Sequence, residues 1–247
     1  MTPIERTYDL ATVRALWRRD VTRFWREPMR LASALGRPFI FWLVIGAGMT
    51  SAFRIEGVSI GCLEYFYPGV VMMVALFAAI FANVTVIEDR HHGFLQAVLA
   101  GPGSRAALVL GKSLGAASVA FVQVVAFLLF APLAGFSLFD VSWPLLLGTT
   151  VVVCLGLSAV GFAMAWWLDS VSAYHTVQMM LLLPMWVLSG AVFPPSADSP
   201  VFRWVMHANP MASLFKDIPG PLVPVVPKEP ANAAPIDEQM AAISSSA

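Results

Sequence analysis

The chain has 247 residues, of which 58% are hydrophobic and only 12% charged, and its mean hydropathy is +0.75. A soluble globular domain carries about 25% charged residues, so this composition excludes a soluble protein and indicates an integral membrane protein. Fifteen basic residues balance fifteen acidic ones, and the lack of a net basic field argues against nucleic-acid binding.

The N-terminal segment, residues 1–37, combines a helical apolar stripe with an excess of arginine. Eight of the fifteen basic residues precede Pro38, so the positive-inside rule predicts a cytoplasmic N-terminus. Apolar residues recur at helical spacing from Val13 to Trp25, with arginines on the other faces, which is typical of an amphipathic helix in the membrane interface. Its predicted interfacial residues are Trp17, Arg18, Arg19 and Trp25. The pattern supports a simple anchor and a partner-docking element equally.

Five apolar segments approach or exceed the length of about 20 residues that a helix needs to cross a bilayer. They cover residues 38–53, 65–87, 113–136, 143–168 and 171–193. The predicted fold is an all-α integral membrane protein, a polytopic helical bundle of five spans preceded by the interfacial amphipathic helix. The distribution of basic residues favours a cytoplasmic position for the segment between the second and third spans.

That segment, residues 88–105, carries the clearest signal for function. An apolar stripe covers about two helical turns and consists of Phe94, Leu95, Val98 and Leu99. Gly93 precedes the stripe, and Gly101-Pro102-Gly103 ends it because proline lacks an N–H and glycine frees the backbone. We expect a short helix at the membrane surface, on which a cytoplasmic partner could push.

Charged residues flank the short helix on both sides. Glu88 and Asp89 close the preceding span, whereas Arg105 and Lys112 open the next one. Glu88 is compatible with binding to the basic N-terminal helix, with binding to a partner, and with a solvated charge at a loop end. A proton- or sodium-coupled carrier normally buries carboxylates or basic groups near the middle of the membrane. The predicted spans contain no Asp, Glu, Lys or Arg. If the chain is a transporter, the energy for transport would therefore have to come from elsewhere.

The sequence offers no metal site, catalytic residue or nucleotide-binding motif on this chain. His91 and His92 point about 100° apart on a helix and do not form a metal-binding pair, so we expect them to be solvated. Gly111-Lys112-Ser113 lacks the upstream glycine of a P-loop, because position 106 is alanine. For His175, near the start of the fifth span, an interfacial position and a functional role both stay open.

Two motifs resemble those of the permease subunits of type-2 ATP-binding-cassette exporters, the family of the drug-resistance, nodulation-factor and polysaccharide export permeases. The first consists of Glu88, Gly93, Leu95, Pro102, Ser104-Arg105 and Gly111-Lys112. The second consists of Leu188-Ser189-Gly190, Phe193-Pro194-Pro195, Pro200 and Asn209-Pro210. With the N-terminal helix, the resemblance covers about residues 10–215.

The resemblance implies that residues 88–105 form a coupling helix that docks on a separate nucleotide-binding subunit. That subunit would hold ATP and magnesium, whereas this chain would be no enzyme and would carry no cofactor. The implied docking residues are Glu88, Gly93, Phe94, Leu95, Val98, Leu99, Pro102, Arg105 and Lys112. Two permease copies, identical or different, would form the pathway in the inner or plasma membrane, and small residues at 111–118 could supply close helix packing.

The resemblance also implies an outer gate built from a re-entrant segment, residues 194–217, after the fifth span. The implied gate residues are Ser189, Gly190, Phe193, Pro194, Asn209 and Pro210. Family members carry a sixth span after the Asn-Pro motif, whereas this chain continues into a tail, residues 218–247, whose proline content predicts disorder.

Three functional hypotheses follow. The first is the permease of an ATP-driven exporter for a hydrophobic or amphiphilic substrate. The second is a non-transporting structural or assembly protein that lacks the last span. The third is a membrane-embedded enzyme, which would need a polar catalytic cluster that the predicted spans do not contain. ATPase-dependent efflux would separate the first hypothesis from the second.

Overall fold

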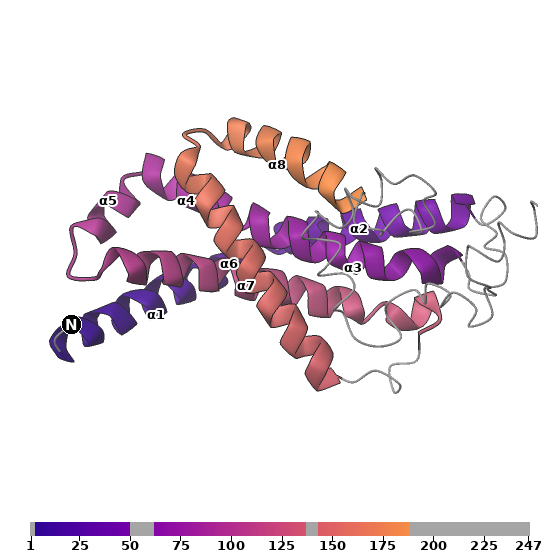
Figure 1. The fold of residues 1–247 in the computed structure, drawn as a ribbon, viewed down its shortest axis with the longest axis horizontal. Helices are drawn as coiled ribbons and strands as arrows, with labels where there is room; N and C mark the ends of the chain where they lie inside the picture. Colours follow the sequence, from indigo (N-terminus) through magenta and orange to yellow (C-terminus); the bar gives the residue numbers. More distant parts are fainter. Residues whose placement is uncertain (1–2, 50–61, 137–142, 188–247) are drawn as a thin grey trace, which may run out of the picture.

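The computed structural model describes residues 3–49, 62–136 and 143–187, and these ranges form helices joined by short turns. The helices are α1 (Pro3–Arg26), α2 (Pro28–Met49), α3 (Cys62–Phe81), α4 (Val84–His91), α5 (Phe94–Leu99), α6 (Arg105–Leu128), the 3₁₀ helix η1 (Ala131–Ala134), α7 (Trp143–Trp167) and α8 (Val171–Trp186). Three helical stretches are long and apolar enough to cross a membrane: Phe66–His91, Arg105–Leu128 and Trp143–Trp167. The predicted all-α membrane bundle is therefore confirmed (Figure 1).

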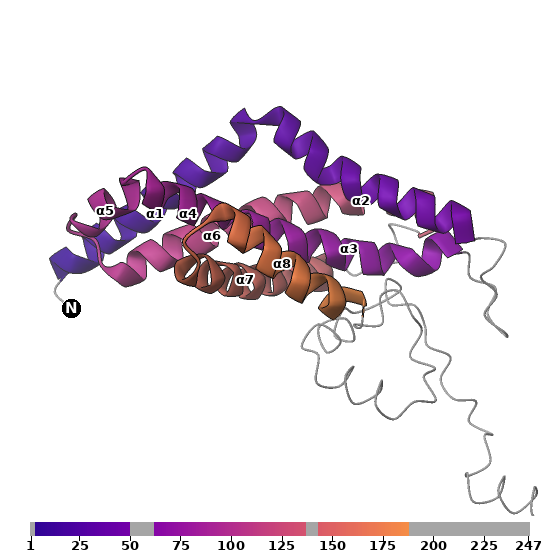
Figure 2. The ribbon, with the colours of Figure 1, turned by 90° about the horizontal axis from the view of Figure 1, so that it is seen from above.

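The first two helices form a bent pair with its corner at Glu27 (Figure 2). Pro28 occupies the first position of α2, where the missing N–H of proline is tolerated. The helix starts well before the predicted first span, because Pro38 is accommodated inside it rather than at its start. Membrane helices tolerate internal proline when neighbouring groups satisfy the freed backbone. Its apolar part covers Ala32–Gly48.

The predicted second span, residues 65–87, is divided into two helices. The helix α3 ends at Phe81, and α4 begins at Val84 and continues to His91. Only Asn83 and Thr85 interrupt the apolar pattern near this junction, so hydropathy gave little sign of the break.

The predicted start of the third span at residue 113 is wrong. The helix α6 begins at Arg105, where the Ser104 hydroxyl caps it by accepting a hydrogen bond from Ala107 N at 3.1 Å. The prediction treated Lys112 as a boundary charge, whereas its side chain is only 1% exposed. Carboxylates from the same chain neutralise it inside the bundle. The helix ends at Leu128 and is followed by η1, so the segment up to residue 136 is not one continuous helix.

The last two predicted spans begin where expected. The helix α7 covers Trp143–Trp167, which agrees with the predicted 143–168. The helix α8 begins at Val171, after Ser170 accepts a capping hydrogen bond from Ala173 N at 3.0 Å. The remainder of the predicted fifth span, after residue 187, lies outside the described residues.

Buried aromatic residues hold α2, α3 and α6 together. The Trp42 indole donates a hydrogen bond to the Leu63 carbonyl at 2.9 Å, and the Tyr67 hydroxyl donates to the Phe127 carbonyl at 2.9 Å. Trp42, Tyr67 and Phe127 are fully buried. The polar ends of these rings are satisfied, so they pack in the core without loss of hydrogen bonding.

Candidate functional site

The short helix α5 has the ends that the sequence predicts. Gly93 precedes it with a φ of +73°, a left-handed conformation that favours glycine. The turn 101–104 then leads directly into α6. Both views show α5 at the same end of the molecule as the start of α1 and the start of α6 (Figures 1 and 2). The helix therefore sits at one end of the bundle.

The accessible face of α5 differs from the predicted docking stripe. Leu95 is only 2% exposed and belongs to the core, whereas Leu99 is 40% exposed. Phe94 and Val98 are half-buried and line a groove against Leu16 of α1. In this structure Leu95 is thus unavailable to a partner, because the stripe packs inward on the chain itself.

A buried ionic network joins α1, α4 and α6 directly behind α5. Arg19 donates two hydrogen bonds to the Asp89 carboxylate, both at 2.7 Å. Lys112 donates to Asp89 and also to Asp20, the latter at 3.1 Å. The Asp89 side chain is only 3% exposed. Two positive and two negative charges face one another, which is the condition under which buried charges are tolerated.

Arg19 connects this network to α5. Its guanidinium carbon lies 3.9 Å from the centre of the Phe94 ring, which is a cation–π contact. Hydrogen bonding to Asp89 raises the pKa of Arg19, so the guanidinium stays charged. Burial raises the pKa of the Asp20 carboxyl, and the positive charge of Lys112 opposes that shift. The sequence placed Arg19 at the membrane interface, whereas the structure turns it inward.

Glu88 pairs with the N-terminal helix, one of the three options that its sequence position left open. Its carboxylate accepts a hydrogen bond from Arg23 at 2.9 Å, and Arg23 also lies 3.4 Å from Glu27. All three side chains are about one-third exposed or more. Such pairs contribute little to stability, so this contact orients α1 rather than holding it.

On its other side, α4 is tied to the end of α7. The Arg90 guanidinium donates hydrogen bonds to the carbonyls of Trp166, at 3.2 Å, and of Ala165 and Leu168. These are carbonyls of the last turn of a helix, where a positive charge is favourable. The exposed His91 ring lies 2.8 Å from the Asp169 carbonyl. The α4–α5 unit, residues 84–99, is therefore attached to both α1 and α7.

Glycines let α1 lie close against α6. A Cβ added at Gly111 would lie 3.0 Å from Leu16 Cβ, and one at Gly115 would lie 3.0 Å from Asp20 Cβ. Trp17 adds a hydrogen bond from its indole N–H to the Ser118 hydroxyl at 2.9 Å. The small residues at 111–118 therefore pack on α1 of the same chain, rather than being free for a second copy.

The remaining predicted residues divide into two groups. Pro102 and Arg105 are exposed beside α5, and Trp17, Arg18 and Trp25 are exposed on α1. The predicted gate residues lie outside the described residues; they are Ser189, Gly190, Phe193, Pro194, Asn209 and Pro210. The sequence analysis missed Asp20 and the burial of Asp89 and Lys112. The available signal was an aspartate, Asp20, set among the arginines from Arg14 to Arg26.

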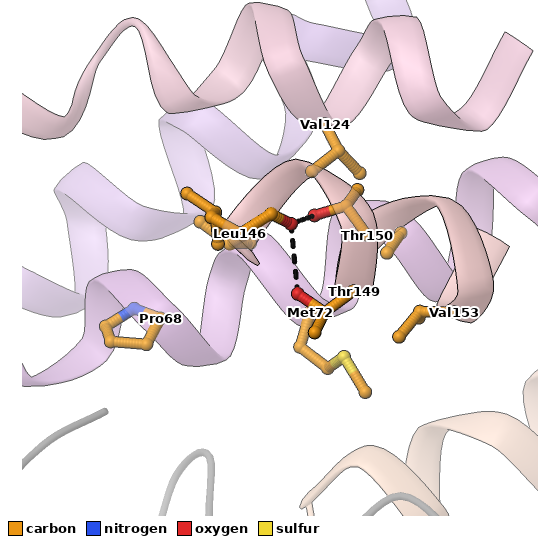
Figure 3. A pocket seen from close by; sticks show the side chains of 9 residues that line it. Pro68, Met72, Val124, Leu146, Thr149, Thr150 and Val153 are labelled. Atoms are coloured by element: carbon orange, nitrogen blue, oxygen red, sulfur yellow. Dashed lines mark hydrogen bonds between the residues drawn. The ribbon is translucent and has the colours of Figure 1, made fainter. Parts of the chain in front are cut away.

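A small, partly open apolar pocket lies between the spanning helices α3, α6 and α7 (Figure 3). Its volume of about 30 Å³ is comparable to that of one water molecule. The Thr149 and Thr150 hydroxyls on its wall both donate to the Leu146 carbonyl, at 3.0 and 2.7 Å. The pocket therefore offers neither the space nor the free hydroxyl donors to hold an amphiphilic molecule.

Comparison with known families decides the class of protein. The family profile described as "ABC-2 type transporter" matches residues 11–217. The chain belongs to the ABC-2 type transporter family. As an ABC-2 permease it is a membrane transport protein, and it is not an enzyme by itself. The family membership expected from the two sequence motifs is thereby confirmed.

Several named proteins are similar to this chain. Nodulation protein J of Sinorhizobium fredii is 29% identical over 80% of this chain and 76% of its own length. The protein named ycf38 of Cyanophora paradoxa, described as a transport permease, is 30% identical over 46% of this chain and only 40% of its own length. The protein of the same name from Porphyra purpurea is 22% identical over 88% of this chain and 76% of its own length. No solved structure gives a significant match.

Proposed function

We propose that this chain is the membrane subunit of an ATP-driven exporter that moves a hydrophobic or amphiphilic substrate out of the cytoplasm or the inner leaflet. A separate ATP-binding-cassette ATPase, which holds ATP and magnesium, docks on α5. The observation that supports this proposal is the attachment of α5. Its outer face is open at one end of the molecule, and its inner face is fixed to a buried ionic network.

The attachments give a physical route for force from α5 into the spans. Arg19 contacts both Phe94 and Asp89, so displacement of α5 acts on α1 and α4 together. Because Asp89 of α4 is bonded to Lys112 of α6, movement of α4 also displaces α6. Arg90 of α4 is bonded to the end of α7, so that helix moves with α4 as well. Buried charge pairs resist separation, because a charge left without its partner in a low-dielectric interior is strongly unfavourable.

The proposed docking face consists of the exposed residues of α5 and the following turn. These residues are Gln96, Ala97, Leu99, Ala100, Pro102 and Arg105. Glu88 and Lys112, which the sequence placed among the docking residues, face α1 and the buried network instead. Two copies of the chain, in the cell membrane with α5 toward the cytoplasm, form the pathway between them.

Co-purification tests the proposal. The tagged chain is co-expressed with the ABC ATPases of its own genome, one at a time, and the detergent-solubilised complex is isolated. We expect one ATPase to bind the wild type and to be lost from Leu99→Asp, because a carboxylate placed on α5 would have to be desolvated when the ATPase covers it. Leu10→Asp is the matched control, since Leu10 is 71% exposed on α1 and lies outside the docking face.

Each outcome has a defined meaning. Loss of the ATPase from Leu99→Asp alone supports α5 as the docking element. Equal loss from both variants means that any added charge at this end disrupts the complex, and the assignment to α5 fails. A stable wild-type chain that binds none of the ATPases refutes the exporter proposal and favours a non-transporting protein built on this scaffold.

A further inference from the structure

The membrane stretch that leads to the docking helix is broken at a defined point. Residues Phe66–His91 are apolar enough to form one span, yet the helix stops at Phe81 and restarts at Val84. The two residues between them, Ala82 and Asn83, are neither proline nor glycine. Kinks without those residues occur at π-bulges or where a side chain or water inserts into the backbone ladder, and polar side chains lie at this break.

Side chains do satisfy the carbonyl groups that the break releases. The Asn83 amide donates to the Ala79 carbonyl at 2.8 Å, and the Thr85 hydroxyl donates to the Ala82 carbonyl at 2.9 Å. The Tyr174 hydroxyl of α8 donates to the Ile80 carbonyl at 2.8 Å. An unsatisfied carbonyl in a membrane is costly, and Asn83 and Thr85 satisfy the two carbonyls that the break releases. The Ile80 carbonyl also accepts from Asn83 N at 3.0 Å, so Tyr174 adds a second hydrogen bond there and ties α8 to the break.

The same amide binds the neighbouring span. Asn83 Nδ2 donates to the Ser158 carbonyl of α7 at 3.2 Å. This contact needs glycine at position 161, where an added Cβ would lie 2.7 Å from Asn83 Nδ2 and 3.1 Å from Ile80 Cα. Asn83 thus sits at the point where α3, α4 and α7 meet.

Unpaired polar groups are buried at this junction and beside it. Asn83 Oδ1 and Ser158 Oγ have no hydrogen-bond partner among the described residues. The same is true of the oxygen and the nitrogen of the Gln178 amide. Gln178 is completely buried and lies one helical turn beyond Tyr174 on the same face of α8. Buried polar groups without a partner are rare and require an explanation. A second conformation of the helices, in which these groups are hydrogen-bonded, would explain them.

We infer that Asn83 is a positioning residue and that the α3–α4 junction is the hinge about which the α4–α5 unit moves relative to the spans. In the second position the buried polar atoms that have no partner here, on Asn83, Ser158 and Gln178, gain hydrogen-bond partners. The motion is the response to the ATPase and in that respect rests on the proposed function. The hinge itself is a property of the chain alone and is measured without the ATPase.

The expected displacement is measurable. The helix α4 has 8 residues, so at 1.5 Å per residue it is a lever of about 12 Å. A change of about 20° at the junction, the size of a distinct kink, moves its far end by about 4 Å. Distance measurements between spin labels resolve shifts of this size.

The test places one label on each side of the hinge. His92→Cys at the far end of α4, outside the proposed docking face, and Val152→Cys on α7 are exposed positions, and Cys62 and Cys154 are replaced by alanine. The distance between the two spin labels is measured by pulsed electron paramagnetic resonance, with the full chain in lipid nanodiscs. We expect Asn83→Leu, which removes both amide hydrogen bonds, to shift the distance by about 4 Å or more. The conservative Asn83→Gln, which keeps the amide, should restore most of the wild-type distance.

Gly161→Ala provides a second variant, since it keeps every hydrogen-bonding side chain and its added Cβ presses on Asn83 Nδ2, at 2.7 Å, and on the adjacent Ile80 Cα, at 3.1 Å. Its matched control is Gly156→Ala on the same helix, where nothing lies within 4 Å of the added Cβ. A shift in Gly161→Ala without one in Gly156→Ala supports the hinge. If Asn83→Leu and Gly161→Ala fold and keep the wild-type distance, Asn83 is only a structural contact and the inference is overturned. If Asn83→Leu does not fold, Gly161→Ala decides alone.

A second arm separates this inference from the proposed function. With the ATPase bound, addition of ATP and vanadate should shift the same distance. Asn83→Leu should keep the ATPase but lose ATP-dependent efflux of a fluorescent phospholipid from proteoliposomes. If wild type binds no ATPase, the proposed function fails while the label distances still decide on the hinge. If wild type exports and Asn83→Leu exports equally well, the hinge fails and the function stands.

Discussion

Asp89 and Lys112 form an ion pair inside a helical bundle, where two isolated charges would be strongly unfavourable. Arg19 and Asp20, both from the N-terminal helix, complete a neutral set of four groups. No one helix carries the whole set, so the charges are compensated only when α1, α4 and α6 are assembled. At the scale of residues, this set specifies how the α5 end of the protein is put together.

Removing one carboxylate should therefore destabilise the protein strongly. Asp89→Asn leaves Lys112 and Arg19 facing only Asp20, and we expect a loss of about 3–5 kcal/mol in the free energy of unfolding. The double variant Asp89→Asn/Lys112→Met should lose less than the sum of the two single variants. Denaturation in detergent, followed by size-exclusion chromatography with fluorescence detection, measures both.

Arg23→Gln is the control for this prediction. It breaks the partly exposed pair with Glu88 and should change stability by no more than about 1 kcal/mol. An equal effect of Arg23→Gln and Asp89→Asn would show that burial does not set the strength of the network.

The raised pKa of Asp20 predicts a pH effect of defined sign. Burial raises this pKa above its ordinary value of 3.8, so folding takes up a proton in the range between the two values. The contribution of Asp20 to stability is therefore greatest below pH 3.8 and declines as the pH rises through the folded-state value. Asp20→Asn mimics the protonated form and should abolish this part of the pH dependence, as measured by melting temperature between pH 3 and 7. A wild-type profile retained in Asp20→Asn would contradict the assignment.

At the scale of elements, the seam between α1 and α6 depends on glycine. Gly111→Ala would bring a Cβ to within 3.0 Å of Leu16 Cβ and 3.2 Å of Val13 Cα, so α1 must move outward. We expect a loss of about 1–3 kcal/mol, typical of overpacking. Gly156→Ala, with open space around it, should be neutral or slightly stabilising because alanine favours helix. Matching denaturation midpoints for the two variants would argue against a tight seam.

The elements also show what the sequence could predict. Periodicity and helix-ending residues located α5 from Phe94 to Leu99, and hydropathy located α7, because these signals are local. The start of α6 was misplaced because the rule that a charge ends a span assumes an unpaired charge. Lys112 is paired with residues far away in sequence, and only the assembled fold shows that.

The candidate site was predicted in the same uneven way. The stripe of α5 was recognised, but not which side of it is open, because Leu95 and Leu99 are equally apolar and differ only in what packs against them. The break at Asn83 was not predicted, because it depends on hydrogen bonds that only the folded chain shows. The Asn83 amide donates to a carbonyl of α3, and Tyr174 of α8 donates to another. An asparagine and a threonine within an apolar run are weak signals without that context.

At the scale of the whole molecule, α4, α5 and the start of α1 lie at one end (Figure 1). The basic residues that precede Pro38 predict that this end faces the cytoplasm. The variant Gln96→Cys, with Cys62 and Cys154 replaced by alanine, should react with a membrane-impermeant thiol reagent in inside-out vesicles. It should remain unlabelled in right-side-out vesicles. The opposite pattern would invert the topology and exclude docking of a cytoplasmic ATPase on α5.

The spacing of the four charged partners along the chain has a consequence for biosynthesis. Arg19 and Asp20 leave the ribosome long before Asp89, and Lys112 follows last. While the early segments are being inserted, the N-terminal helix has no complete set of partners and rests on lipid headgroups through its arginines and tryptophans. It can settle on its final surface only after the third span has been synthesised. Maturation of the α5 end is therefore a late step, and a ribosome stalled before Lys112 would present this helix undocked to proteases and chaperones.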